Sequence, residues 1–128
     1  MKLELPLDEL KQYLKSSYNL EIDLHNIEEN KIEIDYYVSL TLTVKEVKDH
    51  EILFHYKVNG LLNMLAKGAH YFLEKKMEGI PIEWDASNNE LLLDLTKVDA
   101  LKDFLKILSI SDLIFIDNQI VLSLKTRL

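Results

Sequence analysis

The sequence predicts an α+β domain in which an antiparallel, curved sheet with long strands packs on one long amphipathic helix. Apolar and polar residues alternate without exception from Ile32 to Val44, which is the period of a β-strand with one buried face. Residues 60–78 instead place apolar side chains at helical spacing. The elements follow in the order α-βββ-α-ββ-α-ββ, and 128 residues predict a single domain over 1–128.

The chain begins with a short helix and a strand. A helix over residues 6–16 is predicted by leucines spaced four, three and four residues apart, with Pro6 near its start. Alternation over residues 20–24 predicts a strand, and the polar residues 28–31 predict a turn. The run 32–44 then predicts one strand of about 40 Å, at roughly 3.3 Å per residue. Such a strand must curve or twist.

The phase of alternation slips after Val44, which predicts a bulge or the approach to a turn at residues 48–50. Alternation returns over 52–58, so residues 20–58 predict a three-stranded meander. Asn59 is a suitable N-cap and Gly79 a suitable C-terminal residue for the helix 60–78. Its apolar arc exceeds half the circumference, more than a flat sheet covers. The excess indicates a sheet that wraps around the helix, or a second partner.

The last third predicts two hairpins around a short helix. Alternation over 80–84 and 91–95 predicts the first hairpin. Thr96 and Asp99 resemble a capping box for a helix that carries Val98, Leu101, Leu105 and Leu108. Asp117-Asn118 suits a tight turn between strands 113–116 and 119–125.

Composition excludes several classes of function. The net charge of −7 argues against a nucleic-acid partner and against a purely electrostatic grip on anionic membranes. The chain has no cysteine, which excludes disulfides, thiol nucleophiles and cysteine metal sites. We see no signal peptide and no apolar run of transmembrane length. A cytoplasmic location is therefore expected.

No catalytic motif stands out. The three glycines are scattered and no serine has flanking glycines, so neither a phosphate loop nor a nucleophile elbow is predicted. Glu33 and Asp35 share one strand face and could form an acid–base pair, but a solvated face beside Lys31 is the favoured interpretation. We expect no enzymatic activity and no cofactor.

The histidines are weak candidates for metal ligands. His50 and His55 flank a turn with Asp49 and Glu51, but residues five apart in a strand face opposite ways, so a polar turn is favoured. His25 and His70 are interpreted as solvated. Trp84 shares the phase of the apolar residues before it, which favours packing over ligand stacking.

The order of a meander, the helix 60–78 and hairpins at 80–95 and 113–125 resembles that of tubular lipid-binding (TULIP-like) domains, over most of residues 20–125. The resemblance implies binding of a lipid or another apolar molecule between the curved sheet and the helix, in an elongated interior. The residues expected to line that interior, or to fill it as core, are Ile34, Tyr36, Val38, Leu40, Phe54, Tyr56, Leu61, Leu65 and Phe72.

The alternative function is a protein–protein interaction or assembly subunit with a filled core and no ligand. Sheet edges could pair with another chain, giving a homodimer through strand edges. Tyr37 and Leu53, on the outer faces of their strands, could belong to such a surface. A void between sheet and helix would favour the ligand carrier, and a close-packed interior would favour assembly.

Overall fold

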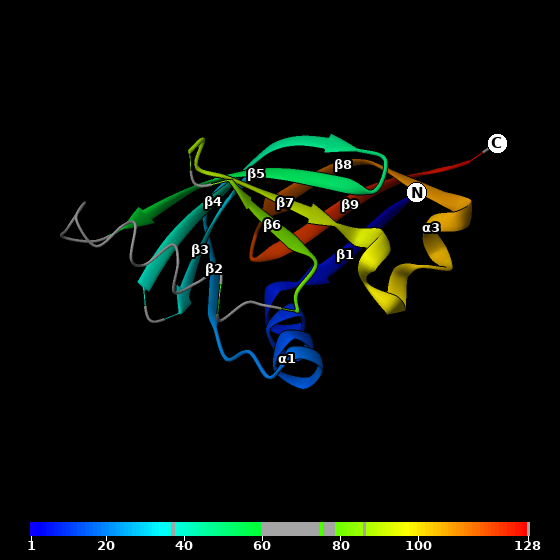
Figure 1. Cartoon of the computed structure of the whole chain (residues 1–128). Helices are drawn as coiled ribbons and strands as arrows, with labels where there is room; N and C mark the ends of the chain where they lie inside the picture. Colours follow the sequence, from blue (N-terminus) through cyan, green and yellow to red (C-terminus); the bar gives the residue numbers. More distant parts are fainter. Residues whose placement is uncertain (37, 60–74, 76–78, 86, 128) are drawn as a thin grey trace.

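The computed structural model describes residues 1–36, 38–59, 75, 79–85 and 87–127 (Figure 1). Its elements, in chain order, are β1 (Lys2–Pro6), α1 (Leu7–Tyr18), β2 (Asp23–Glu28), β3 (Lys31–Tyr36), β4 (Val38–Lys48), β5 (Glu51–Asn59), β6 (Ile82–Asp85), β7 (Glu90–Asp94), the 3-10 turns η1 (Leu95–Lys97) and η2 (Asp99–Leu101), α3 (Phe104–Ile107), β8 (Leu108–Ile116) and β9 (Gln119–Thr126). The expected α+β class with antiparallel strands is confirmed.

The strands form two antiparallel sheets where the sequence predicted one. Six strands are ordered β2-β3-β4-β5-β7-β6, and three are ordered β1-β9-β8. The second sheet exists because β9 pairs with β1, from Lys2 opposite Ser123 to Pro6 opposite Gln119. Apart from Lys75, which is helical and exposed, the predicted helix 60–78 lies outside the described residues, so its packing against a curved sheet stays a prediction.

The predicted single strand 32–44 is wrong, because this run is an antiparallel hairpin of β3 and β4. Ile32 lies opposite Leu42, and Ile34 lies opposite Leu40. The pairs are symmetric about position 37, so even-numbered residues of both strands lie on one face. Alternation therefore continues through the reversal of the chain. The sequence pattern is the same for one long strand and for this hairpin.

The N-terminal segment differs from its prediction in two ways. Residues 2–6 form β1, which the sequence did not predict, and α1 follows directly after Pro6. Asn19 ends the helix with a left-handed φ of 54°, a conformation that asparagine tolerates. The predicted strand 20–24 begins later, as β2 at Asp23.

The predicted bulge and turns are confirmed. The β4–β5 register shifts between Val44 and Glu46, and a turn follows at residues 49–50. Asp117 and Asn118 both have positive φ, 52° and 58°, as a two-residue type I′ hairpin requires. The hairpins of β6 with β7 and of β8 with β9 also match the sequence.

The predicted Thr96–Asp99 capping box is wrong. Asp94 is instead the N-cap of the 3-10 turn η1. Its Oδ1 accepts hydrogen bonds from the Thr96 backbone N–H at 3.0 Å and from Thr96 Oγ1 at 2.6 Å. The helix expected over residues 98–108 is broken into η2 and α3. β8 already begins at Leu108.

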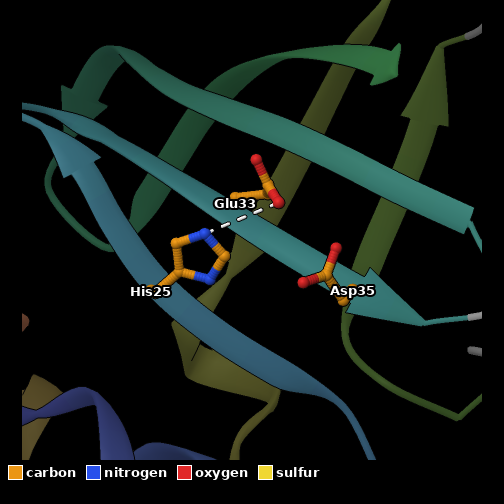
Figure 2. Close-up of side chains that lie close together, drawn as sticks. All are labelled: His25, Glu33 and Asp35. Atoms are coloured by element: carbon orange, nitrogen blue, oxygen red, sulfur yellow. Dashed lines mark ion pairs between the residues drawn. The ribbon is translucent and has the colours of Figure 1, made fainter. Parts of the chain in front are cut away.

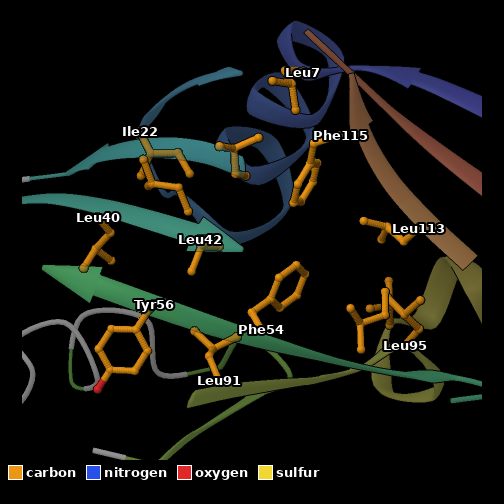
Figure 3. Close-up of a cluster of buried hydrophobic side chains, with 14 of the residues drawn as sticks. Leu7, Ile22, Leu40, Leu42, Phe54, Tyr56, Leu91, Leu95, Leu113 and Phe115 are labelled. Carbon is orange, nitrogen blue, oxygen red and sulfur yellow. The ribbon is translucent and has the colours of Figure 1, made fainter. Parts of the chain in front are cut away.

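The hydrophobic core lies between the two sheets and α1 (Figure 3). β8 carries the contact between the sheets, because it packs against both β2 and β4. Two backbone hydrogen bonds strengthen this seam: the Asn30 N–H donates to the Phe115 carbonyl at 2.9 Å, and the Ile110 N–H donates to the Asp49 carbonyl at 2.7 Å. Among the described helices, none is long and apolar enough to cross a membrane.

Candidate functional site

Four of the predicted interior residues meet in the core. Ile34, Leu40, Phe54 and Tyr56 are each at most 9% exposed and belong to one cluster. Figure 3 shows Leu40, Phe54 and Tyr56 together beside the neighbouring strands. Of the other candidates, Tyr36 and Val38 are backbone partners at the end of the β3–β4 ladder. Their side chains are not among the described parts of the structure. Leu61, Leu65 and Phe72 also lie outside the described residues.

Aromatic rings of the chain itself cover part of this apolar face. Phe54 stacks on Phe115 of β8, with ring centroids 6.1 Å apart. Tyr56 meets Trp84 of β6 edge-to-face at 5.2 Å, so Trp84 packs on the sheet as expected. In the described part of the chain, this region is therefore filled by side chains.

An open groove lies along β6 and β7. Its volume is about 520 Å³, and it is lined by Glu51, Gly79, Ile80, Pro81, Ile82, Glu83, Leu92, Asp94 and Lys97. Apolar side chains and three carboxylates thus share one depression with one lysine. The lining residues come from β5, β6, β7, η1 and the segment before β6, so no local sequence pattern indicates the groove.

Next to this groove, His50 lies in a cluster of carboxylates at the β4–β5 turn. Its Nδ1 lies 3.1 Å from Asp49 Oδ2, and its Nε2 lies 3.6 Å from Glu51 Oε1 and 3.9 Å from Asp94 Oδ1. Arg127 at the end of the chain reaches Asp49 Oδ1 at 2.7 Å. This ion pair therefore links the β4–β5 turn to the residue that follows β9 of the three-stranded sheet. His55 lies further along β5, opposite Thr43.

These contacts lower the pKa of two aspartates. Hydrogen bonds from Arg127 and then from His50 hold the pKa of Asp49 below its usual value. For Asp94, the hydrogen bond from Thr96 is the main cause of a lowered pKa, and the charge of His50 adds to it. Both carboxylates are thus ionised throughout the neutral range.

A second polar cluster lies on the outer face of the hairpin of β2 and β3 (Figure 2). His25 lies directly opposite Glu33, with Nε2 3.5 Å from Glu33 Oε1. Asp35 follows two residues later on the same face of β3. One ligand atom from each of the three side chains lies within 4.8 Å of the others. From the sequence we predicted that His25 is solvated and that Glu33 and Asp35 lie on a solvated strand face. The sequence analysis did not predict that the three side chains are neighbours.

No protein-family model, curated protein sequence or solved structure matches this chain. The resemblance to tubular lipid-binding domains therefore stays a prediction. The site must be interpreted from its own geometry.

Proposed function

We propose that this chain is a non-enzymatic protein-interaction domain that binds an extended segment of a partner along the groove beside β6. The groove carries this proposal, because it combines apolar and acidic lining residues with a place next to an edge strand. β6 is the last strand of the six-stranded sheet among the described strands. Extended peptides bind such edges through their backbones, and pockets beside the edge select their side chains.

Charge complementarity indicates the chemistry of the partner. Glu51, Glu83 and Asp94 line the groove, and Lys97 is its one cationic lining residue. The chain as a whole is also acidic, with a net charge of −7. A segment that alternates basic and apolar residues would place its apolar side chains on the face of Ile82. Its cations would lie on the opposite face, where Glu83 pairs with Leu92 and Glu51 pairs with Asp94.

A second copy of the chain is a poorer occupant of this edge. Glu83 and Asp85 are the exposed residues of β6. Pairing of two β6 strands would bring these carboxylates close to each other, and like charges across a strand pair are destabilising. Short, charged edge strands are also a common means of preventing self-association. The expected partner is therefore a different, basic chain.

The single tryptophan, Trp84, lies in β6 and provides a direct test. The intrinsic fluorescence of the purified chain would be titrated with an eight-residue peptide of alternating lysine and valine. A peptide of alternating glutamate and valine is the matched control. We expect a saturable change in fluorescence with the basic peptide only, weakened by added salt.

Two charge-reversal variants sharpen the test. Glu83→Lys should weaken binding of the basic peptide at least about tenfold, since it reverses a charge at the groove. Glu4→Lys makes the same change on exposed β1 in the other sheet and should leave binding unchanged. Equal binding of the two peptides, or equal loss in both variants, would contradict the proposal.

The apolar-ligand hypothesis stays open as a prediction, because it depends on residues 60–78. Native mass spectrometry of the purified protein, before and after mild lipid extraction, tests it. A co-purifying apolar mass that extraction removes would support the carrier. Its absence, together with binding of the basic peptide, would support the interaction domain.

A further inference from the structure

We propose that His25, Glu33 and Asp35 form a surface binding site for a divalent transition-metal cation. This inference is independent of the groove beside β6. It depends on three features of the hairpin of β2 and β3: the identity of the donor atoms, their convergence, and the local balance of charge.

The donors are one imidazole nitrogen and two carboxylates. This combination suits zinc and the neighbouring first-row divalent cations, which accept both nitrogen and oxygen ligands. The atoms lie within 4.8 Å of one another. A tetrahedral ion with metal–ligand distances of about 2.0–2.2 Å holds its ligand atoms about 3.3–3.6 Å apart, so side-chain movements of roughly 1 Å would bring the three donors onto one ion. Figure 2 shows the three side chains close to one another on β2 and β3, with the His25 ring beside Glu33.

The ladder between β2 and β3 sets this convergence. His25 and Glu33 form a direct cross-strand pair, and Asp35 pairs with Asp23 next to them. Cross-strand neighbours have Cβ atoms about 4.5–5.5 Å apart. All three ligands therefore stand on adjacent, hydrogen-bonded strands. A site on strands is positioned more precisely than one on loops.

The charges around the cluster favour a cation. Glu33 Oε1 lies 3.5 Å from His25 Nε2, but Asp35 makes no hydrogen bond or ion pair within the described chain. The adjacent Asp23 is already paired with Lys11 at 2.5 Å, so that lysine is engaged elsewhere. Within the described residues, Glu33 thus has the His25 ring as its partner, and Asp35 has none. A divalent ion would neutralise both carboxylates and take the free nitrogen of a neutral His25.

The site has three protein ligands on an open sheet face, so solvent would complete the coordination. Three ligands and an open position are the arrangement of catalytic rather than structural zinc sites. We propose only binding for this cluster, because none of its three residues lines the groove beside β6. The described groove is lined by β5, β6, β7, η1 and the segment before β6.

Isothermal titration of the tag-free protein with ZnCl2 tests the proposal, together with visible absorption spectra on titration with CoCl2. We expect one high-affinity ion per chain and a cobalt spectrum that changes from that of the aqueous ion. His25→Ala and Asp35→Asn should each weaken binding at least about tenfold, because even changes to residues outside the ligand set have effects of that size.

Two histidine variants serve as controls. His55→Ala removes an exposed histidine on β5, and it should leave the affinity unchanged. His50→Ala tests the other carboxylate-rich histidine. Circular dichroism should show the same melting transition for all metal-free variants within a few degrees. No binding at one ion per chain, or binding that survives His25→Ala and disappears in His50→Ala, would overturn the proposal.

Discussion

The rings of Phe54 on β5 and Phe115 on β8 stack with centroids 6.1 Å apart and an interplanar angle of 17°. This contact joins the six-stranded sheet to the three-stranded sheet. Both residues are at most 5% exposed, so the pair is dry as well as close. The two sheets are therefore linked by an aromatic contact in the core and by the two backbone hydrogen bonds that β8 makes to Asn30 and Asp49.

A double-mutant cycle on this pair tests its role. Phe115→Ala should lower the free energy of unfolding by about 3–5 kcal/mol, from lost burial and the cavity left behind. Phe54→Ala should cost a similar amount. Combining them should cost about 0.5–1.5 kcal/mol less than the sum of the single changes, which is the typical coupling of an aromatic pair. Urea unfolding of the four proteins measures this, and strict additivity would contradict a direct interaction.

Leu40→Ala tests whether the inner face is core. Leu40 is 1% exposed, so truncation should cost about 2–5 kcal/mol of unfolding free energy. Leu3→Ala removes the same atoms from an exposed position on β1 and should change stability by less than about 0.5 kcal/mol. Equal, small effects measured by urea unfolding would show that Leu40 is not part of a packed interior.

The β8–β9 turn provides a third prediction. The Asn118 side-chain oxygen accepts a hydrogen bond from the Asn26 N–H at 3.0 Å, and Asn118 has a positive φ. Asn118→Ala loses this bond and places alanine in a left-handed conformation, which should cost about 1–3 kcal/mol. Asp117→Gly should change stability by less than about 1 kcal/mol, because glycine readily adopts the positive φ. Thermal unfolding would compare them, and a larger loss for Asp117→Gly would contradict this account.

The contact between Asp49 and Arg127 should make part of the stability depend on pH. The folded pKa of Asp49 is lowered, so the native state holds fewer protons than the unfolded state as pH approaches that pKa. The stabilisation is therefore fully present above the unfolded pKa, about 3.9, and is lost as pH falls through the folded pKa.

Asp49→Asn should accordingly lower the melting temperature at pH 7, and its difference from the wild type should shrink at pH 3. Arg127→Met should behave similarly. A part of its effect should persist at low pH, because Arg127 Nε also donates to the Leu105 carbonyl at 2.7 Å. Melting curves at both pH values measure this. A difference between Asp49→Asn and wild type that does not change with pH would contradict the ion pair.

Local sequence patterns predicted elements that depend on neighbouring residues. They failed to predict elements that form only by pairing with a distant segment. The turn at Asp117-Asn118 follows from two adjacent residues that tolerate positive φ. By contrast, Lys2-Leu3-Glu4-Leu5 alternates over only four residues, too few to identify a strand. β1 forms because β9 lies beside it, and this partner is more than 110 residues away.

The cluster of His25, Glu33 and Asp35 was also within reach of the sequence. Ile22 and Leu24 share the even phase of Ile32 and Ile34, yet a two-residue turn at 29–30 would pair even positions with odd ones. Only an extra residue restores a common apolar face, and the structure has an irregularity between Asn26 and Glu28. The same shift places His25 opposite Glu33. The groove had no such signal, because its lining comes from several separate segments.

The pairing of β1 with β9 has a consequence for biosynthesis. The hairpins of the six-stranded sheet close over short sequence separations, so each can form as soon as its second strand leaves the ribosome. β1 is made before β9 and must wait for residues 119–123 before its hydrogen-bonding edge is satisfied. During that interval the nascent chain carries β1 as an unpaired strand. The strand that is made before every other described strand thus waits longest for its partner.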